Sequence, residues 1–325
     1  MKKVCIIYGG PSKESEVSVN TAKEILKNIS QTKYEITLLY IDRKLKCSLE
    51  KYEEGYVFKP KATDEINSCI SVLKGFDLCF LALHGEFGEE GTIQKIFERE
   101  HIKYTGSDSV SSALCFDKYA SSRIVNRDLD ICIPKTILWK KESKVPSIDD
   151  TFNYPLFLKP NKQGSSIGVS MVKDREELEK VLQNVNEEYL IQEAILDAVE
   201  VSCGLLEKKD GKVIELPPVE VAPKLGEFFD YDSKYCSDGA KEIVPPVSIS
   251  SDFSKKISEM SVKIHKLLCC SLYSRSDYLI KDDVVYYLET NTLPGLTSTS
   301  LLPKECLGIG ISYGDLLEFL ITNSL

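Results

Sequence analysis

The first hundred residues alternate apolar runs suited to strands with segments whose apolar residues recur at helical spacing. The run FDLCFLAL is apolar at nearly every position, which is typical of a parallel strand covered on both faces. The pattern predicts strands at Val4–Tyr8, Tyr34–Ile41 and Phe76–Leu83, helices at Val17–Ile29 and Thr92–Arg99, and a short strand at Lys103–Thr105. This order predicts a doubly wound parallel sheet, which places ligands at the carboxyl ends of its strands.

Two loops that follow predicted strands carry candidate functional residues. GGPSKESEVS occupies 9–18 and HGEFGEEG occupies 84–91. Glycine permits tight turns and close approach of a ligand. Taken alone, Glu14 would equally complement a helix dipole, and His84 would fit a hydrogen-bonded structural residue. Because the two loops are expected at neighbouring strand ends, we assign both residues to a ligand site.

A hairpin in the middle of the chain has a loop suited to phosphate. Strands at Pro155–Lys159 and Val169–Val172 flank PNKQGSSIG, residues 160–168. Backbone N–H groups of a Gly/Ser loop can surround phosphate oxygens, and Lys159 and Lys118 would add charge, although an ordinary hairpin loop has the same composition. Neither GxxxxGK[ST] nor GxGxxG occurs, so P-loop and Rossmann nucleotide binding are not indicated.

A second hairpin near the C-terminus carries the strongest chemical signal. Apolar runs at Tyr278–Ile280 and Val284–Leu288 flank Lys281-Asp282-Asp283. If pairing is symmetric about Asp283, one face presents two carboxylates, an amide and a guanidinium, those of Asp277, Glu289, Asn291 and Arg275. Facing carboxylates are costly unless a cation lies between them, and oxygen ligands without His or Cys favour magnesium beside nucleotide phosphates. The alternative is a solvated hairpin face without function.

Two further segments lie between these hairpins. Residues 228–238, FFDYDSKYCSD, combine aromatic and charged side chains and include Lys234 and Tyr235. A loop of this kind predicts a lid that closes over a site. The helix predicted at Asp252–Leu268 has a regular apolar stripe, which indicates core packing, and its His265 is expected to be partly exposed and neutral.

Composition narrows the functional classes. The 325 residues are 42% hydrophobic and 28% charged, as in an ordinary globular protein of two or three domains. The net charge of −9 argues against a nucleic-acid partner but leaves nucleotides open. The N-terminus MKKVCIIYGG has too short an apolar run for a signal peptide, and no run is long enough to span a membrane.

The eleven cysteines are scattered along the chain. None forms a C-x-x-C pair, so neither a zinc site nor a redox motif is indicated. An odd number without a secretory signal predicts reduced thiols in the cytoplasm, most of them small core residues.

The chain resembles the D-alanine–D-alanine ligases of the ATP-grasp superfamily over essentially its whole length. Eight segments carry the resemblance in the family's order: GGPSKESEVS, LALHGEFGEEGTIQ, YTGSDSVSSALCFDK, PLFLKPNKQGSSIGVSMV, EVSCGLL, FFDYDSKY, RSDYLI and LETNTLPGLTSTSLLP. The implied fold is an α/β ATP-grasp fold with an N-terminal doubly wound parallel-sheet domain and two α+β domains clasping ATP. We place the N-terminal substrate domain at 1–107, the central ATP-grasp subdomain at 108–192, and the C-terminal domain with lid and metal site at 193–325.

The implied reaction joins two D-alanines into D-alanyl-D-alanine through a D-alanyl phosphate, for peptidoglycan synthesis, in a cytoplasmic homodimer. For ATP, the resemblance implies phosphate contacts from Lys118, Lys159 and the backbone of Gly164, Ser165 and Ser166, ribose binding by Glu200, and adenine contacts from the backbone at Gln192 and Glu193. For metal ions, it implies two Mg²⁺ or Mn²⁺ held by Asp277, Glu289 and Asn291.

For the amino acids, the resemblance implies that Glu14 takes the first ammonium in a network with Ser165 and Tyr235, and that His84 lies near that alanine's carboxylate. Lys234 would steady the transferring phosphoryl group and Arg275 the oxyanion. Gly295, Ser300 and Leu301 belong to the substrate site, where Ser300 and Leu301 would hold the carboxylate of the second D-alanine.

The chain departs from the family pattern at three places. Ser15 stands where His is frequent, GEEG replaces GEDG, and the spacing between Gln192 and Glu200 is one residue longer than in many members, which puts the adenine contacts in doubt. Two alternatives stay open: a sibling ligase that joins D-alanine to D-lactate or D-serine, and a catalytically silent nucleotide-binding regulator.

Overall fold

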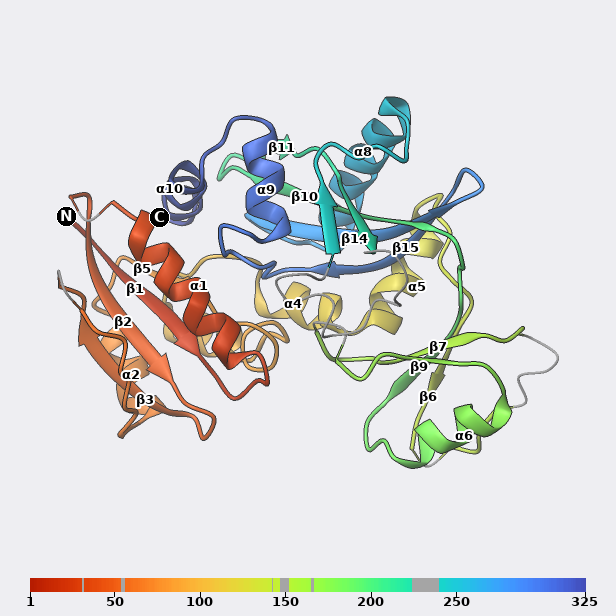
Figure 1. Cartoon of the computed structure of the whole chain (residues 1–325). Helices are drawn as coiled ribbons and strands as arrows, with labels where there is room; N and C mark the ends of the chain where they lie inside the picture. Colours follow the sequence, from red (N-terminus) through yellow and green to blue (C-terminus); the bar gives the residue numbers. More distant parts are fainter. Residues whose placement is uncertain (31, 54–55, 142, 147–151, 165–166, 224–239) are drawn as a thin grey trace.

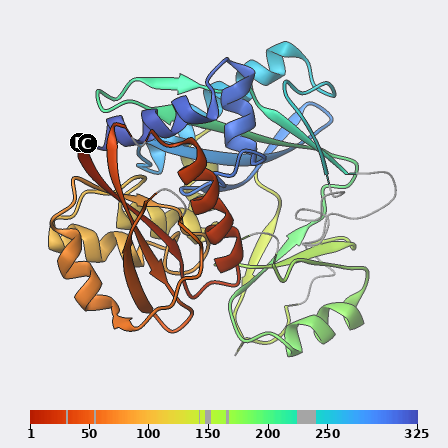
Figure 2. The ribbon, with the colours of Figure 1, turned by 60° about the vertical axis from the view of Figure 1, so that its left-hand side comes forward.

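The computed structural model describes residues 1–325 except 31, 54–55, 142, 147–151, 165–166 and 224–239. Its strands form three sheets with helices packed on them (Figure 1). The N-terminal sheet is red and orange, the central sheet runs from yellow to green, and the C-terminal sheet runs from green to blue. The two chain termini lie close together in both views (Figures 1 and 2).

The N-terminal sheet has the strand order β4-β3-β2-β1-β5. It consists of β1 (Lys2–Gly9), β2 (Tyr34–Ile41), β3 (Lys46–Lys51), β4 (Asp64–Glu65) and β5 (Leu78–Leu81), with helices α1 (Ser15–Asn28), α2 (Ile66–Leu73) and α3 (Thr92–Glu100). Strands β2, β1 and β5 are parallel, as predicted, and β1 is buried from Val4 to its end. The pattern missed β3 and β4, which add an antiparallel edge, and the strand expected near Tyr104 is a single bridge to Cys79.

The central sheet is antiparallel with the order β6-β9-β7-β8. It contains β6 (Thr136–Trp139), β7 (Leu156–Pro160), β8 (Ser170–Val172), α6 (Arg175–Gln183) and β9 (Tyr189–Glu193). Leu178 and Leu182 of α6 pack with Trp139, Leu156 and Leu158 in a core of their own. The two predicted strands of the phosphate hairpin are therefore present, each within one residue of its expected bounds.

The C-terminal sheet has the order β13-β12-β10-β14-β15, with β11 also paired to β10. Its strands are β10 (Val199–Glu207), β11 (Val213–Glu215), β12 (Val219–Pro223), β13 (Ala240–Ile243), β14 (Tyr273–Lys281) and β15 (Val284–Asn291), and the helices around it are α4 (Ser109–Phe116), α5 (Lys118–Asp128), α8 (Ser251–Leu267), α9 (Leu301–Gly308) and α10 (Tyr313–Ser324). None of the helices in the described part of the chain is long and apolar enough to cross a membrane.

One expectation about α8 is wrong. His265 is fully buried instead of partly exposed, because its face of α8 packs on the sheet. Its Nδ1 lies 2.8 Å from the hydroxyl of Ser274 in β14, and burial lowers the pKa of the imidazole. The ring is therefore a hydrogen-bonded part of the core.

A single apolar core connects the N-terminal and C-terminal sheets. Ile6 of β1 and Leu302 of α9 belong to the same buried cluster, together with Leu316 of α10 and Tyr273 of β14. Because buried side chains are close-packed, this shared core fixes α9 relative to both sheets.

The expectation of reduced thiols throughout is wrong at one pair. Cys47 of β3 and Cys69 of α2 form a disulfide with their Cα atoms 6.8 Å apart. They are separated by 22 positions in sequence, and no motif marked them because β3 itself was not predicted. The other cysteines described by the structure are free thiols.

Candidate active site

The predicted acidic hairpin is formed by β14 and β15. Asp277 is paired with Glu289, and Arg275 with Asn291, as predicted. The turn itself is a two-residue turn in which Asp282 and Asp283 both have positive φ, 49° and 63°. Such a turn alone would pair Asp277 with Leu288. A β-bulge skips Leu288 and restores the pairing that symmetry about Asp283 had suggested.

The hairpin face carries a tightly held ion pair. Arg275 Nε and Nη2 donate to the two carboxylate oxygens of Asp277 at 2.8 and 2.9 Å. Burial disfavours the charged guanidinium, but the Asp277 carboxylate outweighs it and keeps the pKa of Arg275 above its usual value. Ser202 of β10 also donates to Asp277, at 2.6 Å. Since Ser202 pairs with Asp277, Glu200 two positions earlier lies on the same sheet face.

Lys118 brings the phosphate loop to this hairpin. It is the first residue of α5, which Asp117 caps by accepting from the backbone of Ala120. The Lys118 ammonium donates to the carbonyl of Gln163 and lies 3.5 Å from Glu289 Oε2. The predicted phosphate-binding lysine therefore bridges the loop between β7 and β8 and a predicted metal ligand.

The two N-terminal loops meet as predicted. Glu14 is 5% exposed although its side chain is ionisable. A Cβ added at Gly85 would lie 2.9 Å from Glu14 Oε2, so the loops after β1 and β5 are in contact. A Cβ at Gly164 would lie 3.0 Å from the same oxygen, so the phosphate loop also reaches Glu14. Three segments predicted separately thus converge on one carboxylate.

Glu89 is a site residue that the sequence reasoning missed. Its side chain is buried, and burial together with the adjacent Glu14 carboxylate raises the pKa of Glu89 above its usual range. Lys118 and Arg275 act in the opposite direction. Two carboxyl groups from the loops after β1 and β5 and two cations from other elements therefore lie near enough to influence one another. Its place in the loop HGEFGEEG, five residues after His84, was the available signal.

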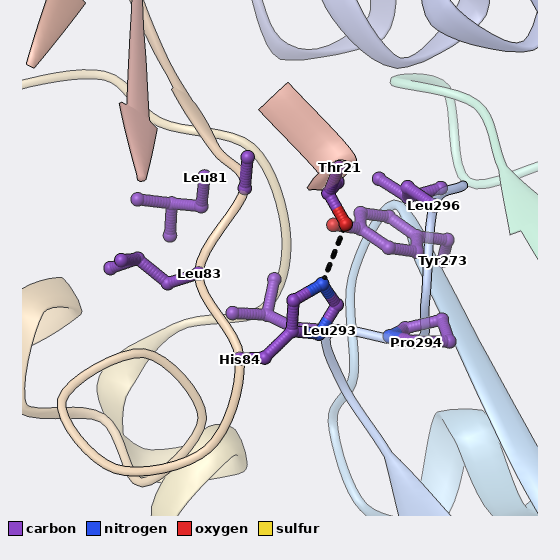
Figure 3. A pocket seen from close by; sticks show the side chains of 9 residues that line it. Thr21, Leu81, Leu83, His84, Tyr273, Leu293, Pro294 and Leu296 are labelled. Atoms are coloured by element: carbon purple, nitrogen blue, oxygen red, sulfur yellow. Dashed lines mark hydrogen bonds between the residues drawn. The ribbon is translucent and has the colours of Figure 1, made fainter. Parts of the chain in front are cut away.

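His84 lies in a small pocket lined by Thr21 of α1, Tyr273 of β14 and mostly apolar side chains (Figure 3). Its Nε2 is 2.9 Å from the hydroxyl of Thr21 in α1, and the pocket is too small for a water molecule. Burial lowers the pKa of His84 to about 4. The ring is therefore neutral near pH 7, which suits a hydrogen-bonding role better than a charged contact.

The residues expected at the second substrate lie at the start of α9. Ser300 is the N-cap residue and Leu301 the first residue of the helix. Ser300 Oγ lies 2.7 Å from Thr297 Oγ1, and a Cβ at Gly295 would approach Ser300 Oγ to 2.8 Å. Free N–H groups at a helix N-terminus favour an anion, which fits the expected carboxylate.

The residues expected near adenine and ribose lie on β9 and β10. Gln192 Nε2 donates to Thr136 Oγ1 at 2.9 Å, and Glu193 Oε1 accepts from the Lys135 backbone at 2.7 Å. Both side chains are thus engaged in joining β9 to β6 and the segment before it. The Glu193 backbone N–H also donates, to the carbonyl of Lys135 at 3.0 Å, and β9 is paired on both edges, so adenine contacts from the backbone at Gln192 and Glu193 stay a prediction. Lys159 lies on β7 next to the phosphate loop.

Four of the predicted residues lie outside the described residues: Ser165, Ser166, Lys234 and Tyr235. The lid predicted at 228–238 lies there as well. Within the described part of the chain, no three His, Cys, Asp or Glu residues gather as a metal site. The donor set of Asp277, Glu289 and Asn291 is two carboxylates and one amide, all oxygen, which fits a hard divalent cation better than zinc.

Comparisons with known proteins give a consistent result. The family model described as D-ala D-ala ligase N-terminus matches residues 3–107, and that described as D-ala D-ala ligase C-terminus matches residues 129–322. A D-alanine--D-alanine ligase of Clostridium botulinum strain Langeland is 35% identical, and D-alanine--D-alanine ligase A of Clostridium perfringens strain 13 is 36% identical, each over 99% of this chain and 98% of its own length.

Two solved structures resemble the fold over the whole chain. A D-alanine--D-alanine ligase from Bacillus anthracis complexed with ATP has a TM-score of 0.80 at 31% identity, covering 100% of this chain and 97% of that one. The VanG D-Ala:D-Ser ligase from Enterococcus faecalis has a TM-score of 0.81 at 31% identity, covering 100% and 99%.

Proposed function

This chain belongs to the D-alanine–D-alanine ligase family, and we propose on that basis that it joins two D-alanine molecules in a reaction driven by ATP. The observation that carries the proposal is the convergence of charge around Glu89. The loop that bears it meets Glu14, while Lys118 and Arg275 from other elements act on the same carboxyl. This arrangement offers an acidic site for an amino group beside a cationic site for phosphate.

The first step would activate a poor electrophile. A carboxylate does not react with an amine, so the first D-alanine attacks the γ-phosphorus of ATP and becomes an acyl phosphate, releasing ADP. Phosphoryl transfer of this kind depends mainly on positioning and charge neutralisation. We assign phosphate contacts to Lys118, Lys159 and the backbone at 164–166, ribose to Glu200, and adenine to the backbone at 192–193.

The chain supplies oxygen ligands for the divalent ions that such reactions use. We assign Asp277, Glu289 and Asn291 to two Mg²⁺ or Mn²⁺, which when bound neutralise phosphate charge. Arg275 donates to both carboxylate oxygens of Asp277. A metal ion bound by Asp277 would therefore share those oxygens with the guanidinium. Arg275 would then be placed beside the developing oxyanion.

The first D-alanine would be held by Glu14 through its ammonium group, with His84 near its carboxylate and Lys234 on the transferring phosphoryl group. The second D-alanine would bind at Gly295, Ser300 and Leu301 through its carboxylate. Its amine, once deprotonated, attacks the acyl phosphate carbonyl, and inorganic phosphate leaves. Ser165 and Tyr235 would complete the network around Glu14, and closure of 228–238 would exclude water.

The remaining assignments are part of the same proposal. We place the enzyme in the cytoplasm, where ATP is available, as a homodimer active in peptidoglycan synthesis. We keep the domain boundaries at 107/108 and 192/193. A D-serine-using enzyme is the second candidate, because the VanG D-Ala:D-Ser ligase shares the fold at the same identity as the Bacillus anthracis enzyme.

Phosphate release from ATP, measured with and without D-alanine, tests the proposal. We expect release that requires D-alanine and magnesium, with D-alanyl-D-alanine identified by mass spectrometry as the product. No release would favour a silent nucleotide-binding protein, and equal release without D-alanine would show ATP hydrolysis that is not coupled to ligation. Competition between D-alanine, D-serine and D-lactate for the second position then separates the sibling activities.

A further inference from the structure

Glu305 is a buried carboxyl group to which the reaction proposed above assigns no role. It lies on α9, four residues after Leu301, and is fully buried. Acidic side chains are almost never fully buried unless they are paired. Both of its oxygens accept from the backbone N–H of Gly204, at 3.1 and 3.0 Å.

Gly204 and Glu305 fit each other in two ways. On its edge away from β14, β10 pairs with β12 at Val201 and Ser202, and with β11 from Leu205 onward. Gly204 lies between these two pairings of the described strands, so its N–H has no strand partner on that edge. The carboxylate of Glu305 accepts from this N–H instead. A Cβ at Gly204 would also lie 2.4 Å from Glu305 Oε2 and 2.4 Å from Leu302 Cδ1. Only glycine lets α9 approach β10 this closely.

This contact lies beside the candidate active site. Gly204 is paired with Arg275 on the neighbouring strand, so the space that a Gly204 side chain would fill is on the same sheet face as the guanidinium. Helix α9 therefore covers that face at the level of Arg275. Burial raises the pKa of Glu305 well above its usual value, while the Gly204 N–H and Arg275 oppose that rise.

We propose that Glu305 is a positioning residue for the second amino acid. Its bond to Gly204 joins α9, whose first turn begins at Ser300 and Leu301, to the strand pair that carries Arg275. The bond thereby fixes the distance between the N-terminus of α9, which binds the carboxylate of the second D-alanine, and the guanidinium of Arg275, which faces the reacting carbonyl. This inference rests on the roles proposed above for Ser300, Leu301 and Arg275.

Three variants test the link in the full-length enzyme with magnesium and ATP. Glu305→Ala removes the acceptor, and Glu305→Gln keeps an acceptor oxygen at the same reach. Cys306→Ala is the matched control. Cys306 is the next residue of α9 and is equally buried, but within the described residues it makes no side-chain hydrogen bond to β10. Separate KM values for the two D-alanine sites come from the dependence of rate on D-alanine concentration.

We expect Glu305→Ala to raise the KM for the second D-alanine by roughly tenfold, the factor that corresponds to one hydrogen bond to a buried carboxyl group. The KM for ATP and the positional isotope exchange within ATP, which reports acyl phosphate formation alone, should stay unchanged. Glu305→Gln should restore the second KM, and Cys306→Ala should lower stability without changing it.

Several results would overturn the inference. They are an unchanged second KM in Glu305→Ala, an equal rise in the KM for ATP, an equal effect of Cys306→Ala, or failure of Glu305→Gln to restore binding. If Glu305→Ala does not fold, Glu305→Asp shortens the reach by one methylene and gives the same comparison. Absence of dipeptide from the wild type would instead refute the proposed function, and an unchanged second KM in Ser300→Ala would refute the role of that residue alone.

Discussion

Lowering the pH should destabilise the protein through one buried imidazole, that of His84. The pKa of His84 falls from 6.5 to about 4 because the ring is enclosed between Thr21 and apolar side chains. The unfolded chain therefore binds a proton between these two values that the folded chain does not bind. The stabilisation is complete above about pH 6.5, is lost progressively as the pH falls towards about 4, and changes no further below that value.

The size of the effect follows from the two pKa values. At about 1.4 kcal/mol for each tenfold change in proton affinity, the full loss is about 3 kcal/mol. At about pH 5 the linkage relation gives a loss of about 2 kcal/mol relative to about pH 7.5. A loss of this size is a substantial fraction of the typical free energy of unfolding of a domain.

His84→Gln removes the titrating ring and keeps an amide that can still bond to Thr21. Urea denaturation followed by far-ultraviolet circular dichroism gives the free energy of unfolding at each pH for both proteins. The wild type should lose about 2 kcal/mol more than the variant between about pH 7.5 and about pH 5. His101→Gln, which removes an exposed imidazole, is the matched control and should follow the wild type.

Other acidic groups titrate in the same range, but they are present in all three proteins and cancel in the differences. Parallel curves for wild type and His84→Gln would show that His84 accepts a proton as readily in the folded state as in the unfolded one. The burial argument for this pocket would then be wrong. The burial argument would stand if the variant were less stable at neutral pH but its free energy of unfolding still changed less with pH than that of the wild type.

Three further predictions concern the candidate active site. Glu289→Gln should leave the fold intact but raise the magnesium concentration for half-maximal activity about 10- to 100-fold, and normal activity at ordinary magnesium would remove Glu289 from the metal ligands. Amide hydrogen exchange in 228–238 should slow when nucleotide and D-alanine or a phosphinate mimic are added; unchanged exchange at saturation would show that this loop is no lid. Wild type should make mainly dipeptide when D-alanine and D-lactate compete near neutral pH, and Tyr235→Phe should raise the depsipeptide share. Mainly depsipeptide from the wild type would place the chain in the other branch.

Periodicity predicted the elements that carry a strong apolar signal. The strand Tyr34–Ile41 has the predicted bounds, and the helix at Thr92 differs by one residue at its end. The edge strand β3, KCSLEK, was missed because it is short and mostly polar, and its place depends on pairing with β2. The disulfide at Cys47 was missed for the same reason, since its geometry exists only after that edge has formed.

The pairing of Asp277 with Glu289 in the hairpin was predicted correctly, but from the wrong turn geometry. The sequence placed Asp277 opposite Glu289 by assuming a symmetric turn, whereas the chain uses a tighter turn and then a bulge at Leu288. The function-bearing face was predictable because opposing carboxylates need a cation wherever the turn lies. The bulge was not, because the run Val284–Leu288 is apolar at every position and so shows no alternation in which the shift caused by one extra residue could be recognised.

The residues that sequence reasoning missed are those whose partners are far away in the chain. Ser202 was within reach, because side chains alternate and it stands two positions after Glu200 on β10. Glu305 was not, because a glutamate in a short helix is ordinarily a solvated side chain. It is buried here because an N–H 101 positions earlier lies in a gap between two strands, and because the residue at that position is glycine. Both conditions exist only in the assembled sheet. The role of Glu305 can therefore be inferred only once the relative positions of β10, β14 and α9 are known.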